Sequence, residues 1–143
     1  MRKSLTLTVL VAAVFLGEIA HAEPPANIDT SDRITIEACV LSSEKPHISS
    51  HVPGTVNVTA RTVCKGISAG RNLKITITLV RKDGGNTLPI TKSITGVGSV
   101  VGNISMPCIW VRKQAEIEYI VTTVHRMSNG KSATTRNGAT LKC

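Results

Sequence analysis

Alternation of apolar and polar residues with a period of two is the feature of this chain that most constrains its fold. It runs through 34–40, 55–61, 73–79 and 116–121, and more weakly through 133–141. Successive side chains of a strand point to opposite faces, whereas a helix needs apolar residues spaced by three or four. These segments therefore predict β-strands with one face turned to a core.

Turn sequences separate the alternating segments. Pro-Gly at 53–54, Asp-Gly-Gly-Asn at 83–86 and Ser-Asn-Gly-Lys at 128–131 supply the residues that tight turns prefer. Two further short strands are expected within 88–106, with a glycine-rich bend at 96–98. The pattern predicts an all-β fold of six or seven antiparallel strands, packed as a two-sheet sandwich.

An immunoglobulin domain is the best-known sandwich, and the chain departs from its pattern. Trp110 follows Cys108 by two residues instead of lying between two cysteines of opposite sheets, and no Tyr stands two residues before the second Cys of a pair. We therefore expect an Ig-like architecture but not a true immunoglobulin domain.

The N-terminal segment reads as an export signal. Arg2 and Lys3 precede an apolar run over 5–17, and Ala-His-Ala at 20–22 fits a cleavage site, which disfavours an uncleaved anchor. We predict a signal peptide over 1–22, a flexible lead-in over 23–32 and one domain over 33–143. No second apolar run follows, so a secreted protein with no membrane span is expected.

Four cysteines lie after the predicted cleavage site, and an even number in an exported chain indicates two disulfides. Among three possible connectivities we favour Cys39–Cys64 with Cys108–Cys143. A metal site is disfavoured because no Cys-x-x-Cys occurs. Cys39 falls on the polar face of its predicted strand, so a bulge or a bridge at a sheet edge is expected.

Composition excludes several kinds of binding site. Loss of the signal peptide removes Phe15, which leaves Trp110 and Tyr119 as the only aromatic residues. Two rings cannot form a stacking platform for nucleic acid or the aromatic bed of a typical sugar site. The core must then be built from Val, Ile, Leu and Ala, so the disulfides matter for stability.

The charge is basic but spread along the chain. Loss of Arg2, Lys3 and Glu18 lowers the net charge from +8 to +7, and the tightest basic pairs are 81–82 and 112–113. This is no nucleic-acid motif. Plain solubility and protection of sheet edges by lysines account for it most simply, and a salt-sensitive attraction to polyanions is the functional alternative.

One stretch resembles a family. Pro-His-Ile-Ser-Ser-His at 46–51 and Pro-Gly-Thr-Val-Asn-Val-Thr-Ala at 53–60, followed by Cys64, are similar to a pattern in small exported proteins of actinobacteria. That family is functionally uncharacterised. The resemblance implies export, two disulfides and a β-fold, and it carries no active site. In that setting a polyanionic partner would be an anionic wall polymer, extracellular DNA or an acidic protein.

Histidines are the first candidates for chemistry. His47 and His51 are four residues apart, a spacing that binds metal on a helix. Pro46 and Pro53 bracket them, so a loop is expected, and the two remain weak metal candidates; no cofactor is expected. His125 is expected at a solvated strand end.

Paired carboxylates are the second candidates. Glu116 and Glu118 share a strand face, as a glycosidase requires, but a solvated face opposite lysines is the simpler interpretation. No Gly-x-Ser-x-Gly occurs. We expect a non-enzymatic binding or envelope-associated module. The alternatives are an inhibitor or antagonist of another protein acting through loop 44–54, and a small secreted hydrolase.

Overall fold

The computed structural model describes residues 33–83, 86–108 and 116–142, and these form nine strands and one short 3-10 helix. No helix in this part of the chain is long and apolar enough to cross a membrane. The predicted signal peptide and lead-in lie outside the described residues, as do Trp110 and the basic pair at 112–113. The elements are β1 (Arg33–Ile36), β2 (Cys39–Ser43), β3 (His47–Ile48), β4 (Thr55–Cys64), η1 (Gly66–Ser68), β5 (Asn72–Asp83), β6 (Asn86–Val97), β7 (Ser99–Pro107), β8 (Glu116–Met127) and β9 (Ser132–Lys142).

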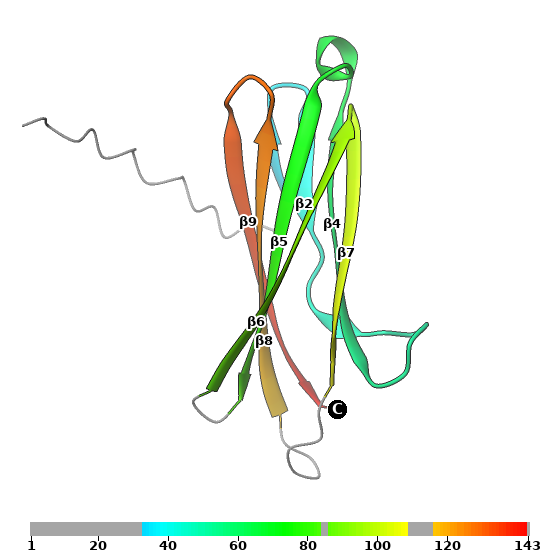
Figure 1. Ribbon diagram of the computed structural model, residues 1–143, viewed down its shortest axis with the longest axis vertical. Coiled ribbons are helices and arrows are strands. Elements are labelled where there is room, and N and C mark those ends of the chain that lie inside the picture. Colours follow the sequence, from blue (N-terminus) through cyan, green and yellow to red (C-terminus); the bar gives the residue numbers. More distant parts are fainter. Residues whose placement is uncertain (1–32, 84–85, 109–115, 143) are drawn as a thin grey trace, which may run out of the picture.

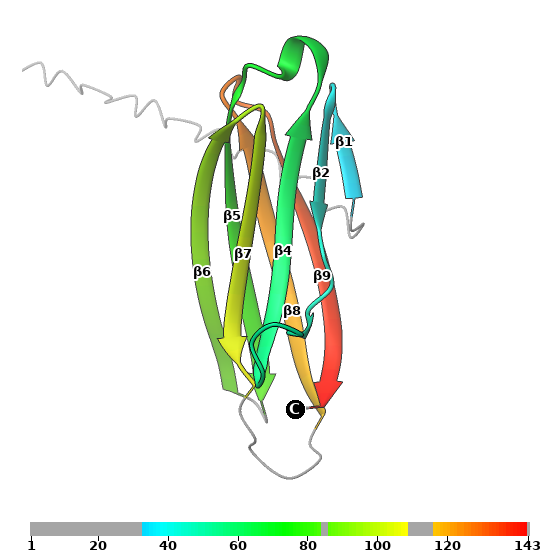
Figure 2. The ribbon, with the colours of Figure 1, turned by 90° about the vertical axis from the view of Figure 1, so that its right-hand side faces the viewer.

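The strands form two antiparallel sheets, as predicted (Figures 1 and 2). In the β4 sheet, β4 pairs with β7 along one edge and with β2 and β3 along the other, and β1 pairs with β2. The β5 sheet has the order β6-β5-β8-β9. The all-β two-sheet sandwich is confirmed, with more strands than the six or seven expected.

The core between the sheets is aliphatic. Leu41, Val58, Ile77 and Val121 are fully buried, because each lies on the inward phase of its strand. Gly102 lets the sheets approach: a Cβ there would lie 2.3 Å from Ile94 Cδ1. Side chains of this size bury little area each, so the two sheets must pack closely.

The segment predicted as one strand over 34–40 is two strands joined by a tight turn at Glu37 and Ala38. Ile36 pairs with Cys39 across this turn, and Glu37 has a left-handed φ of 56°. Because the turn contains two residues, the inward positions change from even-numbered residues in β1 to odd-numbered residues in β2. Cys39 therefore points inward. No bulge is needed: Cys39 lies opposite Cys64 on the neighbouring strand, and their disulfide is confirmed with Cα atoms 3.9 Å apart.

Cys108 follows β7 and is also disulfide-bonded. Its side chain is buried, and its sulfur lies 3.7 Å from the hydroxyl oxygen of buried Tyr119. The partner that we predicted, Cys143, lies outside the described residues, so that pairing stays a prediction.

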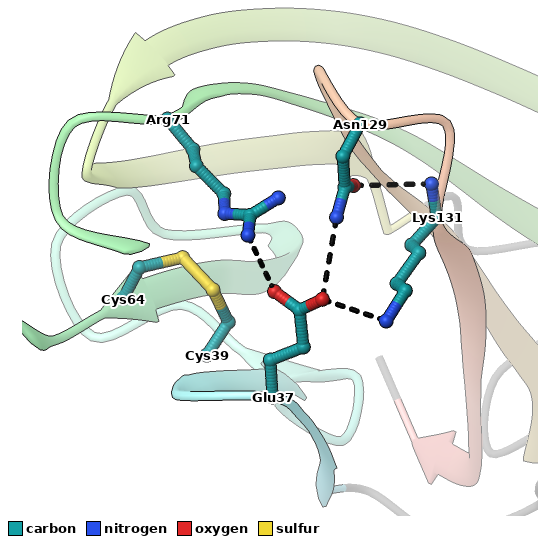
Figure 3. A network of polar contacts seen from close by, with 6 residues as sticks. All are labelled: Glu37, Cys39, Cys64, Arg71, Asn129 and Lys131. Carbon is teal, nitrogen blue, oxygen red and sulfur yellow. Dashed lines mark hydrogen bonds and ion pairs between the residues drawn. A yellow bond between two sulfur atoms is a disulfide. The ribbon is translucent and has the colours of Figure 1, made fainter. Parts of the chain in front are cut away.

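Four connections gather at one end of the sandwich, which we call the η1 end (Figures 1 and 2). They are the β1–β2 turn, the loop that contains η1, the β6–β7 turn and the β8–β9 turn. Figure 3 shows how Glu37 joins three of them, since its carboxylate lies 2.8 Å from Arg71 Nη2 and 2.6 Å from Lys131 Nζ. The β3–β4 loop projects near the opposite end.

Candidate functional site

The outward surface of the β5 sheet carries hydroxyl groups in register. Ile75 and Ile77 point into the core, so Thr76 and Thr78 between them point outward. The neighbouring strand β6 places its own hydroxyl residues beside them. We call the following set the hydroxyl face: Thr76, Thr78, Thr91, Ser93, Thr95 and Thr122, with the cations Lys74, Arg126 and Arg136.

The hydroxyl face is ordered in rows across the strands. Thr76 lies opposite Ser93, with hydroxyl oxygens 2.9 Å apart, and Thr78 lies opposite Thr91 at 3.1 Å. Thr122 continues the second row on β8. Rows of one face are about 7 Å apart along a strand and strands are about 4.8 Å apart, so the hydroxyls form a regular grid that presents both donors and acceptors.

Two cations meet at the η1 end of this grid. Lys74 on β5 lies directly opposite Arg126 on β8 and also opposite Thr95 on β6. Like charges at directly opposed positions of a sheet disfavour folding. Among the described residues neither makes an ion pair, although both are exposed. An anion that bound between them would relieve this repulsion.

A shallow hollow lies at the same place. It has a volume of about 490 Å³ and is lined by Lys74, Thr95 and Arg126 together with the apolar residues Leu73, Val97 and Met127. The charged and hydroxyl groups lie on the hydroxyl face. Val97, 64% exposed, gives the hollow an apolar surface at its η1 end, whereas Leu73 and Met127 are buried. The hollow therefore suits a ligand with both anionic and aliphatic parts.

Every glutamate that the structure describes has a cationic partner elsewhere. Glu37 binds Arg71 and Lys131, and Glu44 binds Arg61 at 3.1 Å. The two remaining pairs are Glu116 with Lys142 and Glu118 with Lys82, both at 3.4 Å. The expected solvated face of Glu116 and Glu118 opposite lysines is thus confirmed, and the unpaired positive charge is concentrated on other residues.

The pKa of Glu37 lies below its usual range. The main cause is the hydrogen bond that Lys131 donates to its carboxylate, and Arg71 adds to the effect. Asn129 Nδ2 also donates to the same carboxylate, at 3.4 Å. This network is structural: it ties the turns of the η1 end to one another beside the hydroxyl face.

His47 and His51 lie in the segment that was predicted as a loop. His47 is in the two-residue strand β3 opposite Asn57, and its ring Nδ1 lies 3.1 Å from the main-chain oxygen of Lys45. His51 lies in the β3–β4 loop, and both side chains are exposed. No three His, Cys, Asp or Glu residues in the described part of the chain are placed to hold a metal ion.

The segment 44–54 is partly strand and partly loop. Its tip, 49–54, is braced from within, because Ser49 Oγ accepts hydrogen bonds from the main-chain N–H groups of His51 and Val52. Thr55 Oγ1 donates to the Val52 carbonyl at 2.8 Å. The loop projects from the sandwich with Val52 56% exposed (Figure 1).

The prediction that His125 lies at a solvated strand end was wrong. Strand β8 continues to Met127, and His125 lies on its inward phase, 1% exposed. Its Nδ1 is 2.8 Å from Thr62 Oγ1 in the opposite sheet, and its Nε2 is 3.0 Å from Thr135 Oγ1. Burial lowers the pKa of His125 to about 4, so the ring is neutral at physiological pH.

Sequence reasoning identified the strands of the hydroxyl face but missed the face. The available signal was Thr-x-Thr at 76–78 and Thr-x-Ser-x-Thr at 91–95, on either side of the turn at 83–86. Hydroxyls two apart on a strand share one face, and a two-residue turn between residues 83 and 86 puts those of both arms on the same face. The meeting of Lys74 with Arg126, far apart in the chain, required the order of the strands.

No protein-family model matches this chain, and no curated protein is similar to it in sequence. The fold and the surface therefore define the protein only as a class: a disulfide-bonded antiparallel β-sandwich with a cationic, hydroxyl-rich outer face.

Proposed function

We propose that this protein is an exported, non-enzymatic binding module whose hydroxyl face holds an anionic polymer with phosphodiester groups. The observation that supports this most directly is the opposed pair Lys74 and Arg126, which has no carboxylate partner among the described residues. All four described glutamates are paired elsewhere. This pair therefore adds a local concentration of uncompensated charge to the excess that is spread over the surface.

Phosphodiester is favoured over other anions because of the hydroxyl grid. Lys, Arg, Ser and Thr side chains are common partners of phosphate oxygens. Rows headed by Thr76 and Thr78 extend the surface away from Lys74 and Arg126, so a chain of repeating units can contact it over several repeats. A wall polymer built from polyols and phosphates matches both group types, and no described residue of this face carries a ring for stacking on a sugar.

Export supports the same assignment. The predicted signal peptide and the two cysteine bridges, of which Cys39–Cys64 is formed in the structure, suit an oxidising environment outside the cytoplasm. A polymer of the cell envelope is an anion that such a protein would meet at high local concentration.

The proposal is tested by titration with poly(glycerol phosphate) at several salt concentrations. The double variant Lys74→Gln/Arg126→Gln is compared with Arg61→Gln/Lys142→Gln, which loses the same charge from two exposed ion pairs. Two lost phosphate contacts lower the slope of log affinity against log salt by about 1 to 2. We expect that loss only in the first variant.

Equal weakening of both variants would contradict the proposal, because it would mean that only net charge matters. Polyglutamate serves as the comparison polymer. Wild-type binding that is as tight to polyglutamate as to poly(glycerol phosphate) would remove the role of the phosphodiester group.

Inhibition of another protein is the second candidate. Its support is the β3–β4 loop, which projects and is braced by Ser49 and Thr55. Stoichiometric inhibition of an extracellular protease that is lost on Val52→Asp would favour it over polymer binding. Nothing in the site supports the hydrolase hypothesis, which stays an untested prediction.

A further inference from the structure

Ile67 is the most exposed large apolar residue that the structure describes. It lies in η1, at the apex of the loop between β4 and β5, and its side chain is 96% exposed. The next most exposed is Val97 at 64%, the last residue of β6 at the same end. Single apolar residues are common on surfaces, so Ile67 carries an argument only together with the way in which it is held and what surrounds it.

The loop that presents Ile67 is fixed on several sides. It starts immediately after the Cys39–Cys64 disulfide, and Lys65 N–H donates to the Ala38 carbonyl at 2.9 Å. Arg71 ends the loop in the ion pair with Glu37 (Figure 3). Ile67 therefore stays at the apex and cannot turn inward to join the core.

Gly98 in the β6–β7 turn holds the same loop through two main-chain hydrogen bonds. Its N–H donates to the Arg71 carbonyl at 2.9 Å, and its carbonyl accepts from Cys64 N–H at 2.8 Å. A Cβ at Gly98 would lie 2.0 Å from the Ala69 carbonyl oxygen. The β6–β7 turn and the η1 loop are thus in direct contact, so Val97 belongs to the same end as Ile67.

The charges around this end are mostly positive. Glu37 is its one carboxylate among the described residues, and Arg71 and Lys131 already pair with it. Lys65 beside η1 is exposed and makes no ion pair with a described residue. The opposed cations Lys74 and Arg126 of the hydroxyl face lie next to this end, on β5 and β8.

We propose that the η1 end docks on an anionic lipid bilayer, with Ile67 inserted among the acyl chains and Lys65 at the headgroups. The η1 loop forms the tip of this end (Figure 1), and Ile67 within it is 96% exposed, which suits a flat fluid surface. Juxtaposed aliphatic and cationic groups bind such surfaces through buried apolar area and attraction to anionic lipids. This contact is separate from polymer binding on the hydroxyl face.

Co-sedimentation with vesicles of equal parts phosphatidylglycerol and phosphatidylcholine tests the proposal. The wild-type chain should bind, and Ile67→Ser should bind about tenfold more weakly, since it loses one buried aliphatic side chain. Val101→Ser is the matched control, because Val101 is 58% exposed on the outer face of the other sheet. That control should bind like the wild type.

The charge contribution is measured in the same assay. Binding should weaken as salt rises from about 0.1 M to about 1 M, where the screening length falls from roughly 10 Å to 3 Å. Lys65→Gln should weaken binding, while Lys142→Gln at the opposite end should not. Unchanged melting temperatures show that the variants are folded, as expected for exposed positions.

Several outcomes would overturn the proposal: no binding of the wild type at low salt, equal binding of Ile67→Ser, or binding that salt does not affect. Affinity of Ile67→Ser for poly(glycerol phosphate) should stay at the wild-type value, so failure here and failure of polymer binding are distinguishable. If Ile67 instead inserted into a pocket of a partner protein, the wild-type chain would not bind vesicles. The vesicle assay therefore distinguishes a protein partner from a bilayer.

Discussion

At the scale of single residues, His125 is the least expected feature of the core. A neutral imidazole is a donor at one nitrogen and an acceptor at the other, and the hydroxyls of Thr62 and Thr135 meet both needs. The ring links the two sheets through polar contacts in a core that is otherwise aliphatic. Protonation inside this layer would bury a charge that has no carboxylate partner among the described contacts.

We therefore predict a pH-dependent stability that is specific to His125. Its pKa in the folded chain is about 4, below the ordinary 6.5, so the unfolded chain binds more protons between these values. The contribution of His125 to the free energy of unfolding is complete above pH 6.5 and decreases as pH drops toward 4. The whole effect is about 3 kcal/mol at roughly 1.4 kcal/mol per unit of pKa. Denaturant unfolding at a series of pH values measures it.

His125→Gln is the variant that isolates this effect, because an amide keeps a donor and an acceptor but does not titrate. Its stability should be nearly constant between about pH 6.5 and 5, a range that lies above the ordinary pKa of 4.5 from which that of Glu37 is lowered. A slope in the variant equal to that of the wild type would show that another group is responsible.

At the scale of elements, the connections of the η1 end determine how the strands meet. The turn at Glu37 and Ala38 sets the phase of β2, and Gly98 sets the distance between the β6–β7 turn and the η1 loop. Gly98 has a φ of 68° and no space for a Cβ. Both features are local requirements of the backbone. The turn at Glu37 orients Cys39 for its disulfide, and Gly98 positions the loop that carries Ile67.

Gly98→Ala should destabilise the fold by at least about 2 kcal/mol, because it adds left-handed strain to a clash with a main-chain oxygen. Gly70→Ala in the neighbouring η1 loop is the control, since a Cβ there meets nothing within 4 Å. That change should stay within about 0.5 kcal/mol. Urea unfolding of both variants checks the pair, and equal losses would contradict the role given to Gly98.

The sequence predicts elements that depend on alternation along one strand, but it does not predict those that depend on contacts with other loops. The Cys39–Cys64 disulfide was predicted from the even number of cysteines and their order, although the alternation placed Cys39 on the polar face of its strand. Period-two alternation was enough for the sandwich. It was not enough for the turn at Glu37, since a glutamate with positive φ has no sequence signal and is stabilised by Arg71 and Lys131 from other loops. The burial of His125 was open to prediction by extending the alternation of β8 to Met127.

At the scale of the whole molecule, charge is segregated in a way that composition hides. The net charge of +8 is spread evenly in sequence, but strand pairing brings Lys74 beside Arg126 and ion pairs neutralise other positions. No local pattern reveals such a site, because its members are distant in the chain. The hydroxyl rows, in contrast, were visible on both arms of the β5–β6 hairpin.

The central claim is that the hydroxyl face binds a phosphodiester polymer, and an amide-resolved NMR titration with poly(glycerol phosphate) tests it most directly. We predict that shifts concentrate in β5, β6 and β8, around Lys74, Thr76, Thr95 and Arg126, and leave the outer face of the β4 sheet unchanged. Shifts centred on the β4 sheet or on the β3–β4 loop, or no shifts at low salt, would contradict the claim.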